Sequence, residues 1–300
     1  MKAYMATFVI VAGLAFQSAQ AEVVAEDGKV EQVDGKWVQT VTRQLAFEPG
    51  GTLRVTSKNG NINVTAWDKN ELLVTAEKHA RPDTGGVKWV LEKLNIGFKD
   101  SDDVQGFLES VTINVVQTGS EIVVDATIPK RSDMSAWVSY DVKIPNQAAL
   151  DLINSNGNVS VTGIQGEISG RSSNGKIQFE ELSGKIICDT SNGRIELVNV
   201  DGPIQAGTSN GGISIEHSGE LSVDDTISCE TSNGSIRVAV PASSAFTLAA
   251  RTSNGSVRTS FDVSRTDDGK RRSRLEGSVN GGGPLLDLRS SNGSISIESL

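Results

Sequence analysis

Apolar and polar residues alternate on both sides of an Asn-Gly pair that recurs along the chain. Apolar residues dominate the third and fifth positions after the Asn and the fourth and sixth positions before it. The second position before the Asn is Ser, Thr or Asn in every copy. A period of two is typical of a strand with one buried face, so a strand is predicted on each side of the turn. The copies are Asn59-Gly60, Asn156-Gly157, Asn174-Gly175, Asn192-Gly193, Asn210-Gly211, Asn233-Gly234, Asn254-Gly255 and Asn292-Gly293.

The spacing of the copies defines a repeating unit. From Asn156 to Asn210 the Asn residues are 18 positions apart, after which the spacing becomes 23, 21 and 38. Within the regular units a second glycine turn falls at Gly166, Gly184 and Gly202. Each unit is therefore strand, Asn-Gly turn, strand and glycine turn, and we expect the Asn-Gly pairs to adopt the positive φ values of a tight turn.

Two architectures fit this unit. In an antiparallel meander the Asn-Gly pair is a hairpin loop, whereas in a β-solenoid each unit is one coil and equivalent positions stack about 4.8 Å apart. A meander needs a second layer to cover its apolar face, while a solenoid encloses its own core. Constant columns of Asn, Ser/Thr and Ile also favour stacking in register. The sequence therefore predicts an all-β protein, a single-chain β-solenoid (β-helix) with coils of about 18 residues.

The remaining segments fit around this stack. Residues 22–49 read as a lead-in strand segment and residues 50–300 as the solenoid domain, with 148–300 as the repeat stack. Residues 80–147 interrupt the repeat but keep strand patterns at 88–98, 111–116, 121–128 and 137–144. Solenoids need end caps over their open rungs, so this insert is predicted to be a strand-rich N-terminal cap.

The first 21 residues have the features of a secretory signal. Lys2 precedes an apolar run from Ala6 to Phe16, and Ala19-Gln20-Ala21 has the small-x-small form of a cleavage site. The apolar run is shorter than the roughly 20 residues that span a bilayer. The sequence predicts export to the periplasm or the cell surface, with cleavage before Glu22 and no transmembrane segment afterwards.

Composition narrows the functional classes. The 300 residues carry a net charge of −9, which argues against a nucleic-acid partner. The 31 glycines show no Gly-X-Y period, so a collagen is excluded. Residues 264–284 contain a basic run and three consecutive glycines, which indicates a solvated excursion or, less simply, an anion-binding patch.

The two cysteines occupy the same column. Cys188 and Cys229 both stand four residues before the Asn, with Ala206 at that position in the coil between them. Two rungs separate them by about 9.6 Å, more than the roughly 7 Å between Cα atoms that a disulfide tolerates. We predict two free, buried thiols and no disulfide.

Candidate chemistry is sparse. Neither His79 nor His217 has metal-ligand partners at a recognisable spacing, and His217 is predicted at a surface turn. The Asp pairs 102–103, 224–225 and 267–268 fall in predicted loops, and the turns lack the Asp of calcium-binding repeats. We therefore expect no metal, no cofactor and no catalytic residue.

One outward column carries charge three residues before the Asn. It contains Arg171, Asp189, Glu230, Arg251 and Arg289, the weak candidates for binding. Charges on a sheet surface more often pair across strands and protect against aggregation. No base, nucleophile and orienting group can be assembled from the sequence.

Several motifs resemble the bacterial putative-adhesin family. They are Pro49-Gly50-Gly51-Thr52-Leu53, Ala66-Trp67-Asp68, the repeated Ser-Asn-Gly-x-Ile/Val and Gly282-Gly283-Pro284 before the last repeat. The resemblance covers residues 43–300 and implies a β-solenoid of largely unknown function. The chain departs from the family in its 80–147 insert and in its 23- and 21-residue coils.

Three functions remain open at this point. The first is a non-enzymatic exported solenoid with a binding or structural role in the envelope, whose partner is a cell-envelope glycan or protein. The second is a carbohydrate-active β-helix enzyme that acts on an extended polysaccharide. The third is a self-assembling solenoid, because the strand from Ser291 to Leu300 ends the chain and is expected to leave an open rung. The sequence does not define the oligomeric state.

Overall fold

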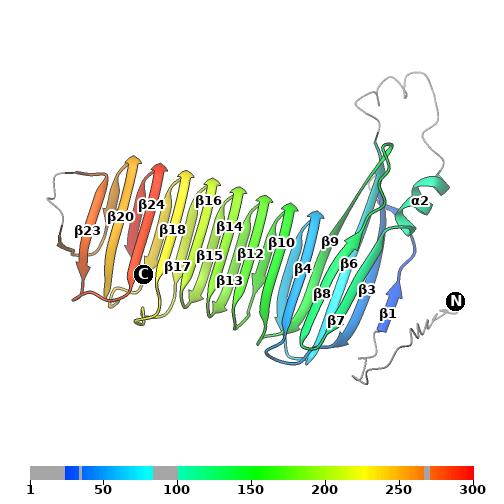
Figure 1. The fold of residues 1–300 in the computed structure, drawn as a ribbon, viewed down its shortest axis with the longest axis horizontal. Helices are drawn as coiled ribbons and strands as arrows, with labels where there is room; N and C mark the ends of the chain where they lie inside the picture. The colour runs from blue at the N-terminus through cyan, green and yellow to red at the C-terminus, as the bar shows by residue number, and fades with distance from the viewer. Residues whose placement is uncertain (1–23, 34–35, 84–100, 267–270) are drawn as a thin grey trace, which may run out of the picture.

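The computed structural model describes residues 24–33, 36–83, 101–266 and 271–300. The molecule is a long stack of strands with the N-terminal segments at one end and β22 and β23 at the other (Figure 1). The proposed signal segment 1–21 and the strand pattern at 88–98 lie outside the described residues.

Two parallel sheets form the stack. The strands that precede each Asn-Gly turn form the upstream sheet, and those that follow it form the downstream sheet. In spatial order the upstream strands are β4 (Thr52–Asn59), β10 (Ala149–Asn156), β12 (Ile168–Asn174), β14 (Ile186–Asn192), β16 (Ile204–Asn210), β18 (Ile227–Asn233), β24 (Leu285–Asn292) and β20 (Phe246–Asn254). The downstream strands are β5 (Ile62–Trp67), β11 (Val159–Thr162), β13 (Ile177–Ser183), β15 (Ile195–Asp201), β17 (Ile213–His217), β19 (Ile236–Val240), β25 (Ile295–Ser299) and β21 (Val257–Thr259).

Equivalent positions of successive coils pair in register. Asn156 pairs with Asn174, and Asn174 with Asn192, in parallel ladders. Parallel pairing excludes the meander, whose hairpins are antiparallel, and confirms the β-solenoid. The apolar columns of both sheets point into the space between them. Their residues are buried in every coil, apart from Val257 and Thr259 of β21, which are half-buried. Where the column narrows to Gly170, the ring of Phe179 occupies the space that a Cβ would take.

The Asn residues form a continuous amide ladder along one edge of the stack. Each side-chain amide donates to the side-chain oxygen of the Asn on the neighbouring rung at 2.8–2.9 Å, from Asn156 and Asn59 to Asn254 and Asn292. Beneath it, the buried Ser and Thr hydroxyls donate to glycine carbonyls of the adjacent coil, as Thr190 does to Gly175 at 3.2 Å. Together these bonds link each turn to its neighbour, as amide and hydroxyl ladders do in other stacked sheets.

Glycine is required in most of these turns for a different physical reason from the expected positive φ. Gly60 and Gly157 have φ values of 121° and 144°, but the glycines of the six later turns lie outside the positive range. There a Cβ would lie 1.8–2.2 Å from the carbonyl oxygen of the glycine on the adjacent rung. Close stacking of backbones therefore excludes a side chain, whereas the half-coil glycines, such as Gly184 with φ 114°, do need positive φ.

Antiparallel strands cap the N-terminal end. In the downstream sheet β9 (Met134–Pro145) pairs with β5 and β6 (Glu71–Pro82), and β6 pairs with β3 (Lys36–Ala46), which carries β1 (Val24–Asp27) and β2 (Glu31–Val33). In the upstream sheet the hairpin β7 (Thr112–Thr118) and β8 (Glu121–Thr127) covers β4. Val41, Leu45 and Phe47 belong to the same core as the coils. The inserted strand-rich cap is thus present, and the boundary at residues 49 and 50 remains a prediction.

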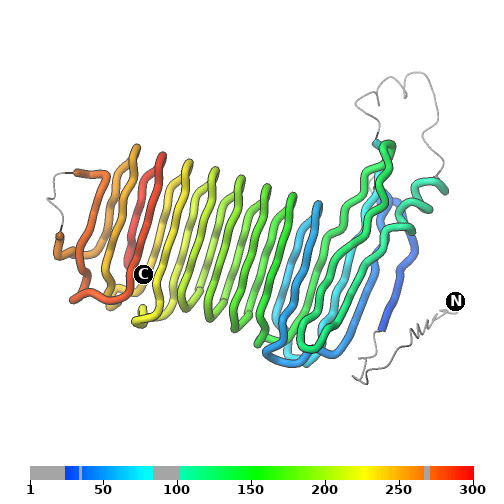
Figure 2. Tube along the Cα trace, in the orientation of Figure 1, coloured from blue at the N-terminus to red at the C-terminus, as the bar shows by residue number. Residues whose placement is uncertain are grey.

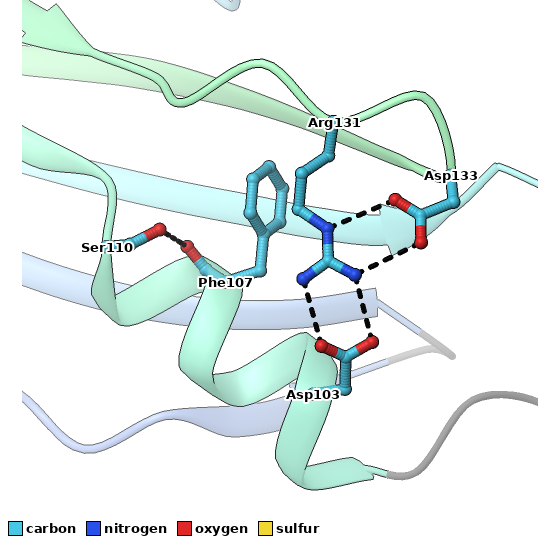
Figure 3. A network of polar contacts seen from close by, with 5 residues as sticks. All are labelled: Asp103, Phe107, Ser110, Arg131 and Asp133. Carbon is cyan, nitrogen blue, oxygen red and sulfur yellow. Dashed lines mark hydrogen bonds and ion pairs between the residues drawn. The ribbon is translucent and has the colours of Figure 1, made fainter.

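The cap also contains a helix that the strand pattern did not predict. In α2 (Ser101–Glu109) the residues Val104, Phe107 and Leu108 are buried against a small second core. The Asp102-Asp103 pair, expected in a loop, lies in the first turn of α2, where acidic residues complement the helix dipole. Arg131 makes two bonds to Asp103 at 2.9 and 3.1 Å and two to Asp133, and its guanidinium lies 5.6 Å from the Phe107 ring (Figure 3).

The C-terminal end differs from the expectation of an open last rung. The final strands β24 and β25 insert between β18 and β20 and between β19 and β21, so the last coil in the chain is the penultimate coil in space (Figures 1 and 2). The segment expected to be an excursion forms β22 (Ser264–Arg265) and β23 (Arg274–Val279), which add antiparallel strands beyond β20. The rung formed by Ser291–Leu300 is therefore interior, which removes the stated reason for self-assembly.

The two cysteines lie in the core of the upstream sheet. Cys188 on β14 and Cys229 on β18 are free and buried, with Ala206 of β16 paired to both. Burial raises the pKa of each thiol above its ordinary value. Both side chains therefore pack as small neutral apolar groups.

Candidate functional site

A shallow groove runs along the outward face of the upstream sheet, and we call it the outer groove. Its larger part has a volume of about 660 Å³ and its smaller part about 230 Å³, and Glu230 lines both. The side chains come from positions one, two and three before the Asn of successive coils. The charged and outermost lining residues are Arg171, Asp189, Glu230, Arg289, Arg251, Ser155, Ser173, Ser191, Ser209, Ser232, Ser253 and Ser291.

All five charged residues singled out from the sequence line this groove. The paired register places Arg171, Asp189, Gly207, Glu230 and Arg289 on consecutive strands. Arg251 follows Arg289, because β24 lies between β18 and β20. The spatial order therefore differs from the chain order, and it leaves two arginines side by side at the C-terminal end of the groove.

Gly207 leaves a gap in the charged column. A Cβ there would lie 2.7 Å from Oδ1 of Asp189, so this carboxylate leans over the glycine. Glu230 flanks the other side of Gly207 on β18. In the described part of the chain neither carboxylate forms an ion pair. Two exposed acceptors therefore remain available in the middle of the groove.

Ion pairs fix the N-terminal end of the groove. Arg171 lies 3.4 Å from Asp151, which also accepts a bond at 3.0 Å from Arg54. At the other end Arg289 pairs with Asp287 of its own strand. The pairs of Asp151 follow the cross-strand pairing expected on a sheet surface, and each of these exposed pairs contributes little to stability.

A column of serines provides most of the hydrogen-bonding capacity. Ser173, Ser191, Ser209 and Ser232 are exposed and repeat once per coil. Each hydroxyl can donate and accept, and the spacing follows the rung distance of about 4.8 Å. The groove can thus present the same polar contact several times along an extended ligand. No histidine or cysteine is among its lining residues.

The prediction for His217 is wrong. Its side chain is fully buried, with 0% exposure, instead of lying at a surface turn. A register shift pairs His217 with Val200 of β15, which is also buried. The 23-residue coil has five residues more than the regular coils, and Asp225, in the loop that follows His217, is 7% exposed. Ligand atoms of Asp201, His217 and Asp225 lie within 4.8 Å of one another, a grouping that sequence spacing did not reveal.

His79 lies in the cap, away from these residues in the fold. Its ring stacks on Trp137 at a centroid distance of 5.1 Å, and its Nε2 lies 3.6 Å from Glu77. Burial lowers the pKa of His79, against the smaller raising effect of Glu77. Its surroundings are those of a packed aromatic side chain.

The fold and the groove define a capped β-solenoid with a polar outer face. The family model described as Toastrack DUF4097 matches residues 11–298, and the chain belongs to this family. No curated protein matches the chain. Among the described residues, no helix has the length and apolar character needed to cross a bilayer.

Solved structures similar to the chain carry names that refer to adhesion. A "putative adhesin" from Bacteroides fragilis is 13% identical over 93% of this chain and 97% of that chain, with a TM-score of 0.39. A "putative cell adhesion protein" from Clostridium sporogenes is 11% identical over 86% and 99%, with a TM-score of 0.36. A "putative adhesin" from Parabacteroides distasonis is 12% identical over 87% and 97%, with a TM-score of 0.31.

Proposed function

We propose that this protein is an exported, non-enzymatic binding protein of the cell envelope, and that its outer groove holds an extended polar ligand. The observation that carries the proposal is the repetition of serine hydroxyls and charged side chains along one face of the stack. A glycan chain is the ligand class that fits best, because its hydroxyls can pair with donors and acceptors at every rung. The acidic net charge of −9 disfavours nucleic acid as the partner.

The export step rests on residues 1–21. We propose cleavage before Glu22, which leaves the lead-in segment 22–49 and the solenoid domain 50–300 in the mature protein. Expression of the full chain in a bacterial host, followed by fractionation and intact-mass measurement, tests this step. A mature mass that begins at Glu22 in the exported fraction supports it, and an uncleaved chain in the cytoplasm contradicts it.

A glycan array followed by calorimetry tests the binding function. The groove variant replaces Ser173, Ser191 and Ser209 by Ala, and the matched control replaces Ser214 and Ser296 on the downstream sheet. We expect the groove variant to bind the selected envelope glycan about tenfold more weakly, since it loses several hydrogen bonds of modest net value. Equal loss in both variants, or no binding to any envelope glycan, contradicts the proposal.

A second candidate is hydrolysis of the same glycan. Asp189 and Glu230 lie on either side of Gly207, two strands apart, which places their Cα atoms about 9.6 Å from each other. Inverting glycosidases use two carboxyl groups at roughly 6.5–9.5 Å. Both side chains are exposed here, whereas a general acid works in an environment that excludes water. Binding is therefore favoured over catalysis.

One experiment separates the two candidates. The glycan selected above is incubated with the protein, and its reducing ends are counted over time for the wild type, Asp189→Asn and Glu230→Gln. The binding function predicts no increase in reducing ends for any of the three proteins. A time-dependent increase that both substitutions abolish supports the hydrolase instead.

A further inference from the structure

The loop between β17 and β18 brings Asp225 close to two other side chains of types that can bind a metal ion. Asp201 ends β15, His217 ends β17, and Asp225 lies in the loop that follows. One ligand atom from each lies within 4.8 Å of the other two, and Nε2 of His217 is 3.7 Å from Oδ1 of Asp201. This site is on the downstream side of the coil and shares no residue with the outer groove.

The hydrogen bonds of His217 determine which nitrogen can bind a metal. Nδ1 lies 2.9 Å from the carbonyl oxygen of Gly219, and a carbonyl only accepts, so Nδ1 carries the proton. Nε2 therefore has the lone pair, and it accepts a bond of 3.2 Å from the N–H of Gly202. Metal-binding histidines usually donate their other ring N–H to a backbone carbonyl or carboxylate in this way.

The two carboxylates are held beside this lone pair. Oδ2 of Asp225 accepts a 2.6 Å bond from the N–H of Ser222, which anchors a carboxylate that is only 7% exposed. Gly219 makes room for Asp201, because a Cβ there would lie 2.6 Å from its Oδ1. Within the described residues neither carboxylate pairs with a lysine or arginine. Two negative charges thus face a buried imidazole without a cation.

We propose that Asp201, His217 and Asp225 bind a divalent transition-metal ion of the Zn²⁺ type. One imidazole nitrogen and two carboxylate oxygens are ligands that Zn²⁺ accepts, with water at the remaining position. Ca²⁺ and Mg²⁺ prefer oxygen ligands throughout, so the imidazole disfavours them. The ion replaces the Gly202 N–H at Nε2 and joins the loop to the ends of β15 and β17.

Metal titration of the purified, chelator-treated protein tests the proposal. Calorimetry with Zn²⁺ is expected to show one site per chain, and Co²⁺ is expected to give the visible absorption of a site with nitrogen and oxygen ligands. Asp201→Asn and Asp225→Asn are expected to weaken Zn²⁺ binding at least tenfold. Asp224→Asn, which changes the exposed neighbour of Asp225, is the matched control and is expected to bind as the wild type does.

The melting temperature with and without Zn²⁺ distinguishes a variant that has lost metal binding from one that folds poorly. A ligand that binds only the native state raises the melting temperature, so Zn²⁺ is expected to raise that of the wild type and of Asp224→Asn. Asp201 is exposed, so Asp201→Asn is the variant expected to fold normally yet show no shift. Absence of saturable binding by the wild type, or binding by Asp201→Asn and Asp225→Asn with the affinity of the wild type, overturns the proposal. His217 then serves only as a bridge between Gly202 and Gly219.

Discussion

Gly211 and Gly212 are neighbours in the chain with different surroundings. A Cβ at Gly211 would lie 1.8 Å from the carbonyl oxygen of Gly193, whereas one at Gly212 would approach Ser235 only to 3.2 Å. We expect Gly211→Ala to lower the free energy of unfolding by about 1–3 kcal/mol, as other overpacked sites do. Gly212→Ala is the control and is expected to cost less. Urea unfolding of both variants measures the difference, and equal losses contradict close rung stacking as the cause.

Cys188 and Cys229 predict a pH dependence of stability. Burial raises the folded-state pKa of both thiols above the ordinary 9.0, so the unfolded state loses these protons first as the pH rises. Their stabilising effect is complete below pH 9.0 and declines above it, by up to about 1.4 kcal/mol per pH unit for each thiol. The double variant Cys188→Ala, Cys229→Ala is expected to show a flatter decline in urea unfolding between pH 8.5 and 10. If the free energy of unfolding of the wild type and of the double variant declines in parallel with pH, the buried thiols are not the cause of the decline.

Single residues also show where pattern reading stops. The alternation around the Asn predicts the buried columns, because each buried position repeats the same geometry in every coil. His217 does not follow the repeat, since a register shift between Leu197 and Val200 pairs it with Val200, whose position faces the core. The charged column could be identified, but the gap that Gly207 leaves between Asp189 and Glu230 requires the stacking order of the strands.

At the scale of elements, the C-terminal coil lies inside the stack. β24 pairs with β18 on one side and β20 on the other, and Leu286 and Leu288 are fully buried. Chain termini usually exchange quickly, but amides held between two strands are protected. Hydrogen exchange followed by mass spectrometry is expected to show slow exchange for residues 286–297 and faster exchange for β22. Rapid exchange of 286–297 while β20 stays protected contradicts this strand order.

The order of the last coils could not be predicted from the alternation. Leu248 and Leu286 stand at the same position of the repeat, and both are buried. Because each repeat position carries the same kind of residue in every coil, the pattern specifies the register between two coils but not which coils are neighbours. The 38-residue spacing between Asn254 and Asn292 provides enough chain for β22 and β23 to extend beyond β20 and for the following strand, β24, to return between β18 and β20. Helix α2 was missed for a different reason, because its three buried apolar residues stand between the predicted strands at 88–98 and 111–116, in a segment expected to be a loop.

At the scale of the whole molecule, stacking in register predicts that one complete coil can be removed. Residues 176–193 form one 18-residue repeat, and their deletion joins Gly175 to Arg194, the residue that follows the equivalent Gly193 in the intact chain. In repeat proteins each unit contacts mainly its neighbours, so stability is approximately a sum over units and interfaces. We expect the deleted protein to fold with strand-rich circular dichroism and a cooperative thermal transition at a lower temperature.

A half-coil deletion is the control for this experiment. Removing residues 176–184 takes away nine residues, including β13, and connects an upstream strand to another upstream strand. The chain must then cross the core between β12 and β14 without forming a downstream strand. β11 and β15 lose β13, the strand that pairs with both of them. This variant is expected to lose the cooperative transition and to aggregate. If both deletions unfold the protein equally, its coils do not act as exchangeable units, and the additive description of the stack is wrong.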